Sequence, residues 1–212
     1  TNTRNDKQSD LLLLTLPFDR RDATGLSWGS LGYTAGRLKL DAQRTAQDSA
    51  SGMDSRGHFS KWNLDVARLQ TTPIDKLALY GRLSAQWASK NLDGSEGFSL
   101  GGPNGVRAYP VNEGHGDEGW LAQLEARYRL GTAEPYLFYD AGRARINADN
   151  ARLLTPLANN TRSLSSAGVG LRWQEGAFSL DASLAWRNRG GKPTSDTQDD
   201  SPRLWATLAY RF

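Results

Sequence analysis

The residues with the clearest chemical potential lie in a long glycine-rich stretch, GGPNGVRAYPVNEGHGDEGW, which covers residues 101–120. Arg107 is the single arginine of this stretch. Its planar guanidinium can form a bidentate, charge-assisted bond with a carboxylate. Glycines before it let the backbone turn and approach another segment closely, whereas Pro103 and Pro110 reduce the entropy lost when the chain is ordered. We therefore expect Arg107 to hold this stretch in a fixed place. The three glycines are Gly101, Gly102 and Gly105.

A candidate partner for this arginine is Asp140, which lies in a segment that reads as a strand. Phe138, Asp140 and Gly142 share one strand face, and Tyr139 lies on the other. A charge-assisted bond is worth ~1.5–3 kcal/mol, and removing one partner of a sequestered pair costs ~3–5 kcal/mol. The alternative is a solvated Arg107 and an unrelated carboxylate, and composition alone favours that alternative.

The elements that must position these residues show alternation of apolar and polar side chains with a period of two. This period is typical of strands with one apolar face, and helical spacing does not fit it. Together with less regular segments the alternation predicts nine strands and an all-β chain. The regular segments cover 77–87, 118–130, 167–173, 178–189 and 204–212, and the less regular ones cover 8–17, 27–40, 58–71 and 134–146.

The predicted strands are long, and their connections alternate between short and long. Strands of ~9–11 residues with aromatic residues near their ends, short turns at one end and long loops at the other are typical of an antiparallel transmembrane β-barrel. The apolar face would meet lipid and the arginine-rich face a watery interior. A soluble antiparallel sheet shares the alternation but predicts shorter strands. Short connections fall at 72–75, 131–134 and 175–176, and long ones at 41–57, 90–118, 147–161 and 190–201.

The composition of the 212 residues, 38% hydrophobic and 23% charged, fits an ordered protein. The absence of cysteine removes disulfides, cysteine-based zinc sites and thiol chemistry. A net charge of +3 could suggest nucleic acid, but lysine and arginine are spread along the whole chain. A soluble basic nucleic-acid binder is therefore a distant alternative. A mean hydropathy of -0.61 is compatible with a barrel that has a polar interior.

Other groups of reactive side chains predict no metal, cofactor or enzyme. Acidic and histidine residues near the end of the glycine-rich stretch lack the geometry of metal ligands, so we expect a solvated acidic loop. The sequence Gly191-Lys192-Pro193-Thr194 departs from a phosphate-binding loop, and we expect an ordinary extracellular loop. His58 has no nearby Ser or Cys nucleophile in the sequence. The four acidic or histidine residues are Glu113, His115, Asp117 and Glu118.

Two motifs in the chain resemble those of the two-partner-secretion transporters, the TpsB proteins such as FhaC and ShlB, which are relatives of the BamA insertase. Val106-Arg107-Ala108-Tyr109 resembles their VRGY/F motif, with Ala108 in place of the usual glycine. Phe138-Tyr139-Asp140-Ala141-Gly142 resembles their F-x-D-x-G motif. The resemblance implies that the loop folds back into the barrel, where its arginine contacts the aspartate. The glycines before the first motif and the Gly116–Trp120 segment after it resemble the TpsB branch in particular.

The resemblance also implies where this chain lies in a larger barrel. The family barrel has sixteen strands, and five follow the motif loop, so residues 1–212 would hold the last nine strands, with the N-terminus cut. Asp19-Arg20-Arg21-Asp22 resembles the periplasmic turn before the ninth strand. The ending with Tyr210 and Phe212 resembles the C-terminal signal read by the barrel-assembly machinery. The plug helix and two POTRA domains of the family would lie upstream of residue 1.

The function implied by the resemblance is an outer-membrane translocation pore of a Gram-negative bacterium. Its partners would be a secreted TpsA-type exoprotein, such as a haemolysin or adhesin, outer-membrane lipid and the assembly machinery. No nucleotide site is visible, so folding of the exported protein outside the cell would supply the energy. A BamA-type insertase and a passive porin are the alternatives.

Overall fold

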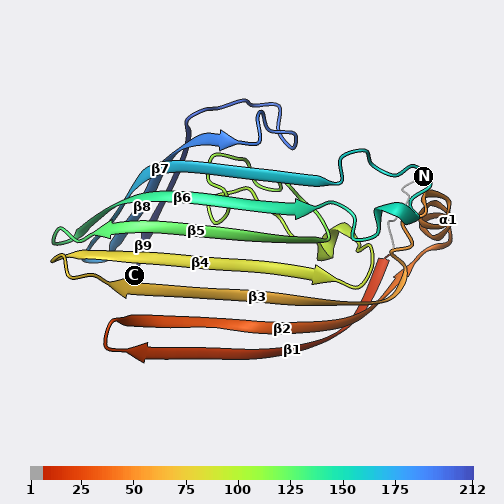
Figure 1. The fold of residues 1–212 in the computed structure, drawn as a ribbon, viewed down its shortest axis with the longest axis horizontal. Helices are drawn as coiled ribbons and strands as arrows, with labels where there is room; N and C mark the ends of the chain where they lie inside the picture. The colour runs from red at the N-terminus through yellow and green to blue at the C-terminus, as the bar shows by residue number, and fades with distance from the viewer. Residues whose placement is uncertain (1–6) are drawn as a thin grey trace.

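The computed structural model describes residues 7–212, which form one sheet of nine antiparallel strands (Figure 1). This confirms the predicted all-β chain with nine strands. The position of these strands as the last nine of sixteen stays a prediction. The strands are β1 (Lys7–Asp22), β2 (Gly25–Leu40), β3 (Gly57–Thr71), β4 (Leu77–Ala88), β5 (Glu118–Tyr128), β6 (Ala133–Arg145), β7 (Thr161–Glu175), β8 (Phe178–Arg189) and β9 (Arg203–Tyr210).

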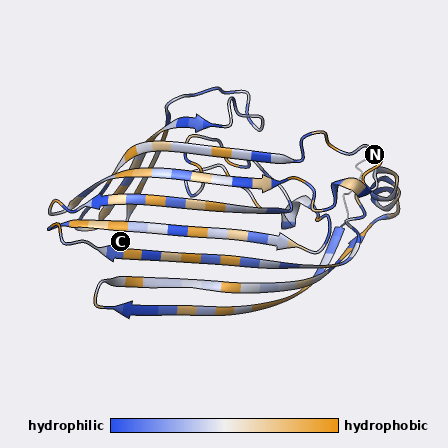
Figure 2. Ribbon diagram, viewed as in Figure 1, coloured by the Kyte–Doolittle hydropathy of each residue, from blue (hydrophilic) through white to orange (hydrophobic). Residues whose placement is uncertain are grey.

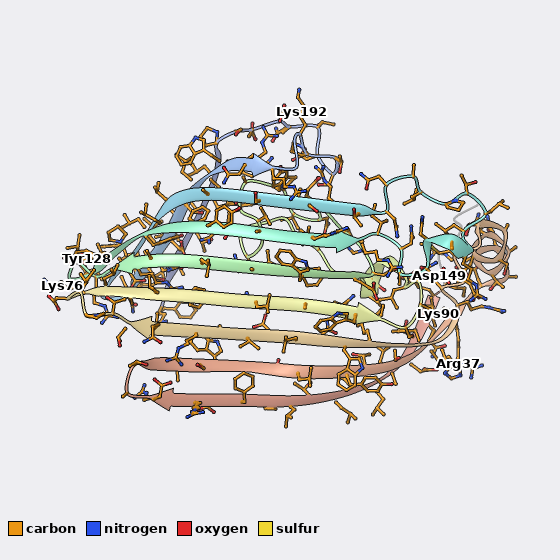
Figure 3. All side chains as sticks on the ribbon, viewed as in Figure 1. Arg37, Lys76, Lys90, Tyr128, Asp149 and Lys192 are labelled. Carbon is orange, nitrogen blue, oxygen red and sulfur yellow. The ribbon has the colours of Figure 1, made fainter. Side chains whose placement is uncertain are left out.

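Each strand pairs with its neighbours in sequence, so that β1 and β9 form the two edges of the described sheet. Four short turns join the strands at one end and four longer connections at the other. Figure 3 labels Lys76 and Tyr128 at the short-turn end and Lys90 and Asp149 at the long-loop end. In outer-membrane barrels the short turns are periplasmic and the longer loops extracellular, so the long-loop end would be the extracellular end of such a barrel.

The two faces of the sheet differ as the alternation predicts. In β6, Leu137 and Tyr139 are exposed on the outer face, whereas Phe138 and Asp140 are buried on the inner face. Figure 2 shows hydrophobic and hydrophilic residues interleaved along the strands. The outer face therefore carries apolar side chains, and the inner face carries the buried carboxylates Glu125 and Asp140.

The core on the inner face is built largely by the long loop, residues 89–117, between β4 and β5. Its apolar side chains pack against inward side chains of the strands, so the loop itself fills this part of the interior. The loop contributes Leu100, Val106, Ala108 and Tyr109, and the strands contribute Leu121, Tyr136, Phe138, Ala144, Leu164 and Ala185.

One α-helix, α1 (Ala42–Ser51), lies in the connection between β2 and β3, where we expected only a loop. Asp41 caps its N-terminus by accepting a hydrogen bond from the backbone N–H of Arg44. Gly52 ends it with a φ of 74°, which glycine adopts without strain. Single-turn 3₁₀-helices occur at η1 (Gly94–Glu96) and η2 (Asn150–Arg152). Within residues 7–212, no helix is long and apolar enough to cross a membrane.

The predicted turn at Asp19–Asp22 is wrong, because these residues continue β1 and pair with β2 down to Asp22 and Gly25. The turn consists of residues 23 and 24. Asp22 stabilises this turn. Its carboxylate accepts hydrogen bonds from the backbone N–H and the hydroxyl of Thr24, and it forms an ion pair with Arg68.

The last strand is also shorter than we expected, because β9 ends at Tyr210 and Phe212 lies beyond it, fully exposed. Tyr210 faces outward beside Phe178, with ring centroids 4.9 Å apart. The role of these two residues as an assembly signal stays a prediction.

Candidate functional site

The structure brings Arg107 and Asp140 together inside the curved sheet. The Arg107 Nε atom lies 2.9 Å from Asp140 Oδ2, and Nη2 lies 2.7 Å from Oδ1. The backbone N–H of Arg107 also donates to Oδ2, at 3.1 Å. Asp140 is fully buried and Arg107 is 4% exposed. Three donors on one residue fix both the side chain and the backbone of the loop tip.

A second carboxylate, Glu125 of β5, completes the site, and the motif analysis missed it. Arg107 Nη1 donates to Glu125 Oε1 at 2.7 Å. The other oxygen of Glu125 accepts from Arg127 and Arg172. Three guanidinium groups thus share one buried carboxylate, and Arg107 lies between two buried anions. Its strand position predicted that Glu125 faces the interior, but no sequence signal related it to the loop.

Aromatic rings and small residues shape the wall around the guanidinium. The carbon at the centre of the Arg107 guanidinium lies 3.6 Å from the ring centroid of Phe138, a short cation–π contact. A Cβ on Gly168 of β7 would collide with the Phe138 ring. Gly142 likewise has no room for a Cβ, because Leu100 and the carbonyl of Trp120 occupy that space. The phenylalanine and glycine of the second motif therefore each have a packing role beside the ion pair.

The indole of Trp205 holds the loop tip from the opposite side. Its Nε1–H donates to the carbonyl oxygen of Arg107 at 2.7 Å. Trp205 pairs with Ser183 and faces inward between the outward Leu204 and Ala206. The signal in the sequence is a large aromatic side chain on the otherwise polar face of the last strand.

The remaining residues of the first motif are buried around this ion pair. Val106 pairs with Gly101, and Tyr109 donates its hydroxyl to the carbonyl oxygens of Arg189 and Gly191. Ala108 is buried and does not have a positive φ. Alanine in place of the family glycine is therefore compatible with this backbone.

The glycines before the motif allow close backbone contacts. Gly102 has a φ of 112°, a conformation that other residues rarely adopt. A Cβ on Gly101 or Gly105 would collide with a carbonyl oxygen, that of Pro110 or Leu100 respectively. These contacts fold the loop into the compact form that presents Arg107.

We call Arg107, Asp140, Glu125 and Trp205 the tip anchor.

A separate cluster holds the returning part of the loop near the extracellular rim. Glu113 is fully buried and accepts hydrogen bonds from Arg162 of β7, at 2.6 and 2.9 Å. It also accepts from the backbone N–H groups of Thr194 and Ser195, both at 2.8 Å. We call Glu113, Arg162, Thr194 and Ser195 the rim anchor. It joins the long loop to residues 190–202, which connect β8 and β9.

The predicted solvated acidic loop is therefore wrong for two of its members. Burial disfavours the charged form of Glu113, but the N–H donors and Arg162 outweigh it and hold the pKa of this carboxyl at about 2. Asp117 is also buried and accepts from the backbone N–H groups of Leu92 and Ala148. Its burial raises the pKa above the ordinary value. The segment 191–194 likewise contacts the long loop and is more than an ordinary extracellular loop.

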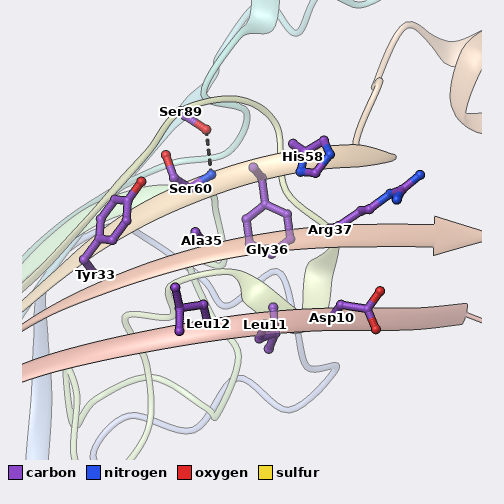
Figure 4. A pocket seen from close by; sticks show the side chains of 11 residues that line it. Asp10, Leu11, Leu12, Tyr33, Ala35, Gly36, Arg37, His58, Ser60 and Ser89 are labelled. Atoms are coloured by element: carbon purple, nitrogen blue, oxygen red, sulfur yellow. Dashed lines mark hydrogen bonds between the residues drawn. The ribbon is translucent and has the colours of Figure 1, made fainter.

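In the rest of the described chain, no other group of side chains is as strong a candidate site as the tip anchor. Among residues 7–212, no three His, Cys, Asp or Glu side chains are placed to hold a metal ion. A hollow of about 580 Å³ beside the edge strand β1 contains His58, Asp10 and Arg37 among aliphatic, aromatic and serine neighbours (Figure 4). A second cavity of about 330 Å³ lies on the inner face beneath the loop tip and is lined by polar groups, including Arg107, Arg127 and Arg172. This second cavity is the polar space next to the tip anchor.

Residues 21–173 match the family described as haemolysin secretion/activation protein ShlB/FhaC/HecB. The heme/hemopexin transporter protein HuxB of Haemophilus influenzae strain 86-028NP is 26% identical in an alignment of 196 residues, which covers 89% of this chain and 33% of that protein. HuxB of strain KW20 is 28% identical over the same shares. The chain thus spans about a third of the length of the curated relatives it matches.

Solved structures of other proteins have a fold similar to that of this chain. CdiB from Escherichia coli superposes with a TM-score of 0.72 at 17% identity, covering 94% of this chain and 36% of that one. BamA from Haemophilus ducreyi lacking POTRA domains 1-3 gives a TM-score of 0.50 at 14% identity, over 98% of this chain and 56% of that one. The matched family, the outward apolar face and these barrels lead to one assignment. The chain belongs to the ShlB/FhaC/HecB family of haemolysin secretion/activation proteins and is part of a β-barrel of the Gram-negative outer membrane.

Proposed function

We propose that this chain is the C-terminal barrel part of a two-partner-secretion translocator, which exports a large partner exoprotein of the haemolysin or adhesin type. The family assignment supports a role in secretion, and HuxB is named as a transporter. POTRA domains upstream would capture the exported chain. The barrel would then offer it a polar path without nucleotide hydrolysis or other enzymatic chemistry.

The observation that carries this proposal is the buried Arg107 between Asp140 and Glu125. A loop held only by apolar contacts could pack in several ways, but a guanidinium bonded at fixed angles to two carboxylates has one favourable position. In this position the long loop occupies the interior of the barrel. We propose that it acts as a brace or gate on the path of the exported protein.

Substitutions in the full-length transporter test the proposal. Arg107→Ala or Asp140→Ala should abolish export, because removing one partner of a buried ion pair leaves the other uncompensated, at a cost of ~3–5 kcal/mol. The partner exoprotein is measured in the culture medium by immunoblot. Insertion of the transporter in the outer membrane is measured in parallel by heat-modifiable migration, and it should remain largely intact.

The matched control is Arg152→Ala, which removes an arginine whose side chain is 59% exposed and paired with Asp54 at the surface. Exposed ion pairs contribute ~0–1 kcal/mol, so export should stay normal. Normal secretion by both Arg107→Ala and Asp140→Ala would refute the proposed role of the loop.

A BamA-type insertase is the second candidate, because a BamA barrel shares this fold. Such a protein would insert other barrels into the membrane, and its loss would lower the levels of many outer-membrane proteins. A translocator would affect only its own exoprotein. Quantitative proteomics of a deletion strain separates these outcomes, and about five upstream POTRA domains in place of two would also favour the insertase.

A passive porin would need neither anchor. Its planar-bilayer conductance would be steady, high and insensitive to Arg107→Ala. A translocator with an ordered internal loop should instead conduct little until this residue is substituted.

A further inference from the structure

A β-bulge in the pairing of β7 with β8 changes the direction of one arginine. Ser166 pairs with Arg187, but Ser165 pairs with Arg189, so Asn188 has no partner in the ladder. Simple alternation along β8 would place Arg189 on the same inner face as Arg187. The extra residue instead places Arg189 opposite Ser165, which belongs to the outer face because it pairs with Ala141. Arg189 is exposed there.

A second arginine, Arg143 of β6, faces outward two strands away. It pairs with the outward Trp120 on one side and with Ser163 on the other, and it is exposed. Neither Arg143 nor Arg189 has a side-chain hydrogen bond or ion pair with another residue in the part of the chain that the structure describes. Two exposed guanidinium groups therefore lie on the face that meets the membrane.

The strand between them, β7, carries hydroxyl groups at each outward position of this region. The backbones of Arg143 and Arg189 lie about 10–12 Å apart across this strand, given the spacing of neighbouring strands and the offset of their partners. Both long side chains can reach a group bound between them. Further along β7 the outward residues are Ala167, Val169, Leu171 and Trp173, so the hydroxyls are confined to the extracellular end. They belong to Thr161 and Ser163, which are half-buried, and to Ser165, which is only 5% exposed.

The charge at this place is positive and is not neutralised by neighbouring acids. Glu118, an outward carboxylate of β5 in this region, is paired with Arg145 at 3.0 Å. The outward indole of Trp120, next to Arg143, is typical of the level where hydrocarbon meets the headgroups. An arginine at that level needs an anionic partner or water, because hydrocarbon can solvate neither its charge nor its donors.

We propose that Arg143, Arg189 and the hydroxyls of β7 bind a phosphate group of lipid A, the lipid of the outer leaflet of this membrane. A phosphate monoester carries a charge of about -1.5 to -2, which matches two guanidinium groups, and its oxygens accept bonds from arginine and hydroxyl donors. The long-loop end of the sheet is the extracellular end, where lipid A lies. This site is independent of the proposed translocation path, since it is on the opposite face of the sheet.

Native mass spectrometry of the full-length transporter in detergent, with added bisphosphorylated lipid A as the probe, tests the site. The wild-type protein should retain one lipid A molecule, and the double variant Arg143→Gln/Arg189→Gln should retain about tenfold less, because each substitution removes charge-assisted bonds. The double variant Arg143→Lys/Arg189→Lys keeps the charge but loses the planar fork, so its retention should be intermediate. Phosphatidylglycerol, whose phosphate carries a single charge, should be retained weakly by all variants.

Arg37→Gln provides the matched control, because Arg37 is an exposed outward arginine of β2 without this hydroxyl surface. It should retain lipid A like the wild type. Equal loss in Arg37→Gln would show a diffuse basic surface, and unchanged retention in the double Gln variant would show no site at all. Either result overturns the proposal, as does equal retention of phosphatidylglycerol. Export should be unchanged in the double Gln variant, so this test is separate from that of the translocation function.

Discussion

The two anchors of the long loop use opposite charges and different kinds of support. In the tip anchor the loop provides the cation, and the carboxylates come from the neighbouring strands β5 and β6. In the rim anchor the loop provides the anion Glu113, and two of its donors are backbone N–H groups of another loop. Strands of a paired sheet are rigid, whereas a connection such as residues 190–202 can change conformation at lower cost. The tip anchor is therefore fixed by the barrel wall, and the rim anchor depends on the state of a second loop.

This difference separates two possible movements. Release of the rim anchor would free residues 190–202 from the barrel mouth while the tip stays in place. Release of the tip anchor would expose a buried guanidinium and two buried carboxylates together. The first movement is the less costly one, so we expect that opening of the barrel begins at the rim.

The largest effect is expected for Asp140→Ala, which leaves Arg107 with Glu125 alone. The tip anchor should lose ~3–5 kcal/mol. Hydrogen exchange of residues 101–109 in the full-length transporter measures the local stability. The control is Asp10→Ala, a carboxylate of β1 whose side chain is 55% exposed beside Lys39 and whose loss should have little effect. Equal protection of the loop tip in both variants would remove the basis for calling this ion pair an anchor.

A smaller effect is expected for Glu113→Gln, which removes the charge that Arg162 and two backbone N–H groups share. Residues 190–202 should exchange about tenfold faster, as expected from the loss of one or more charge-assisted bonds. Residues 101–109 should keep their protection, because the tip anchor makes none of these contacts. If both segments lose protection together, the two anchors form one cooperative unit and the comparison fails.

Trp205→Phe should have a lesser effect still, because it removes one hydrogen bond to the Arg107 carbonyl and keeps an aromatic ring. The expected loss is ~0.5–1.5 kcal/mol, measured from the exchange of residues 106–108. Trp186→Phe, on the outward face, is the control and should leave this segment unchanged. A loss as large as that of Asp140→Ala would mean that ring packing, rather than the hydrogen bond, dominates.

Acidification acts on Glu113 of the rim anchor and gives a partial form of the Glu113→Gln effect, because near the folded pKa only part of this carboxyl is protonated. The folded pKa of Glu113, about 2, lies below its ordinary value of 4.5. Its stabilising contribution is therefore complete above pH 4.5 and is lost as the pH falls towards 2. Asp117 acts in the opposite sense, because its raised pKa favours the protonated form in the folded state, and its unfavourable contribution grows as the pH rises above 3.8. Exchange of residues 190–202 should rise between pH 4.5 and 2 in the wild type, and Glu113→Gln should abolish that rise.

The sequence could predict the strands, the faces and the Arg107–Asp140 pair because each depends on local alternation or on a short motif. Strand alternation placed Phe138 and Asp140 on one face without knowledge of any contact. Glu125 and Trp205 were missed as partners of the loop because their contacts join residues 18 and 98 positions apart. No local pattern reports such a distance.

Two further errors had distinct physical causes. Glu113 lies in a polar, glycine-rich segment that reads as solvated, and its burial depends on donors from residues 194 and 195, far along the chain. Simple alternation predicts Arg189 on the inner face, but one bulged residue inverts the alternation that follows it. A bulge leaves no clear sign in a sequence where polar residues surround it.

The hydrogen bond between Trp205 and Arg107 ties the last strand to the long loop. Within the described chain, β9 pairs only with β8, so the loop tip gives this last strand its second attachment. The tip can bind Trp205 only after the loop has entered the space enclosed by the sheet. Pairing with β8 and contact with the loop tip therefore both contribute to the seating of the final strand during biogenesis.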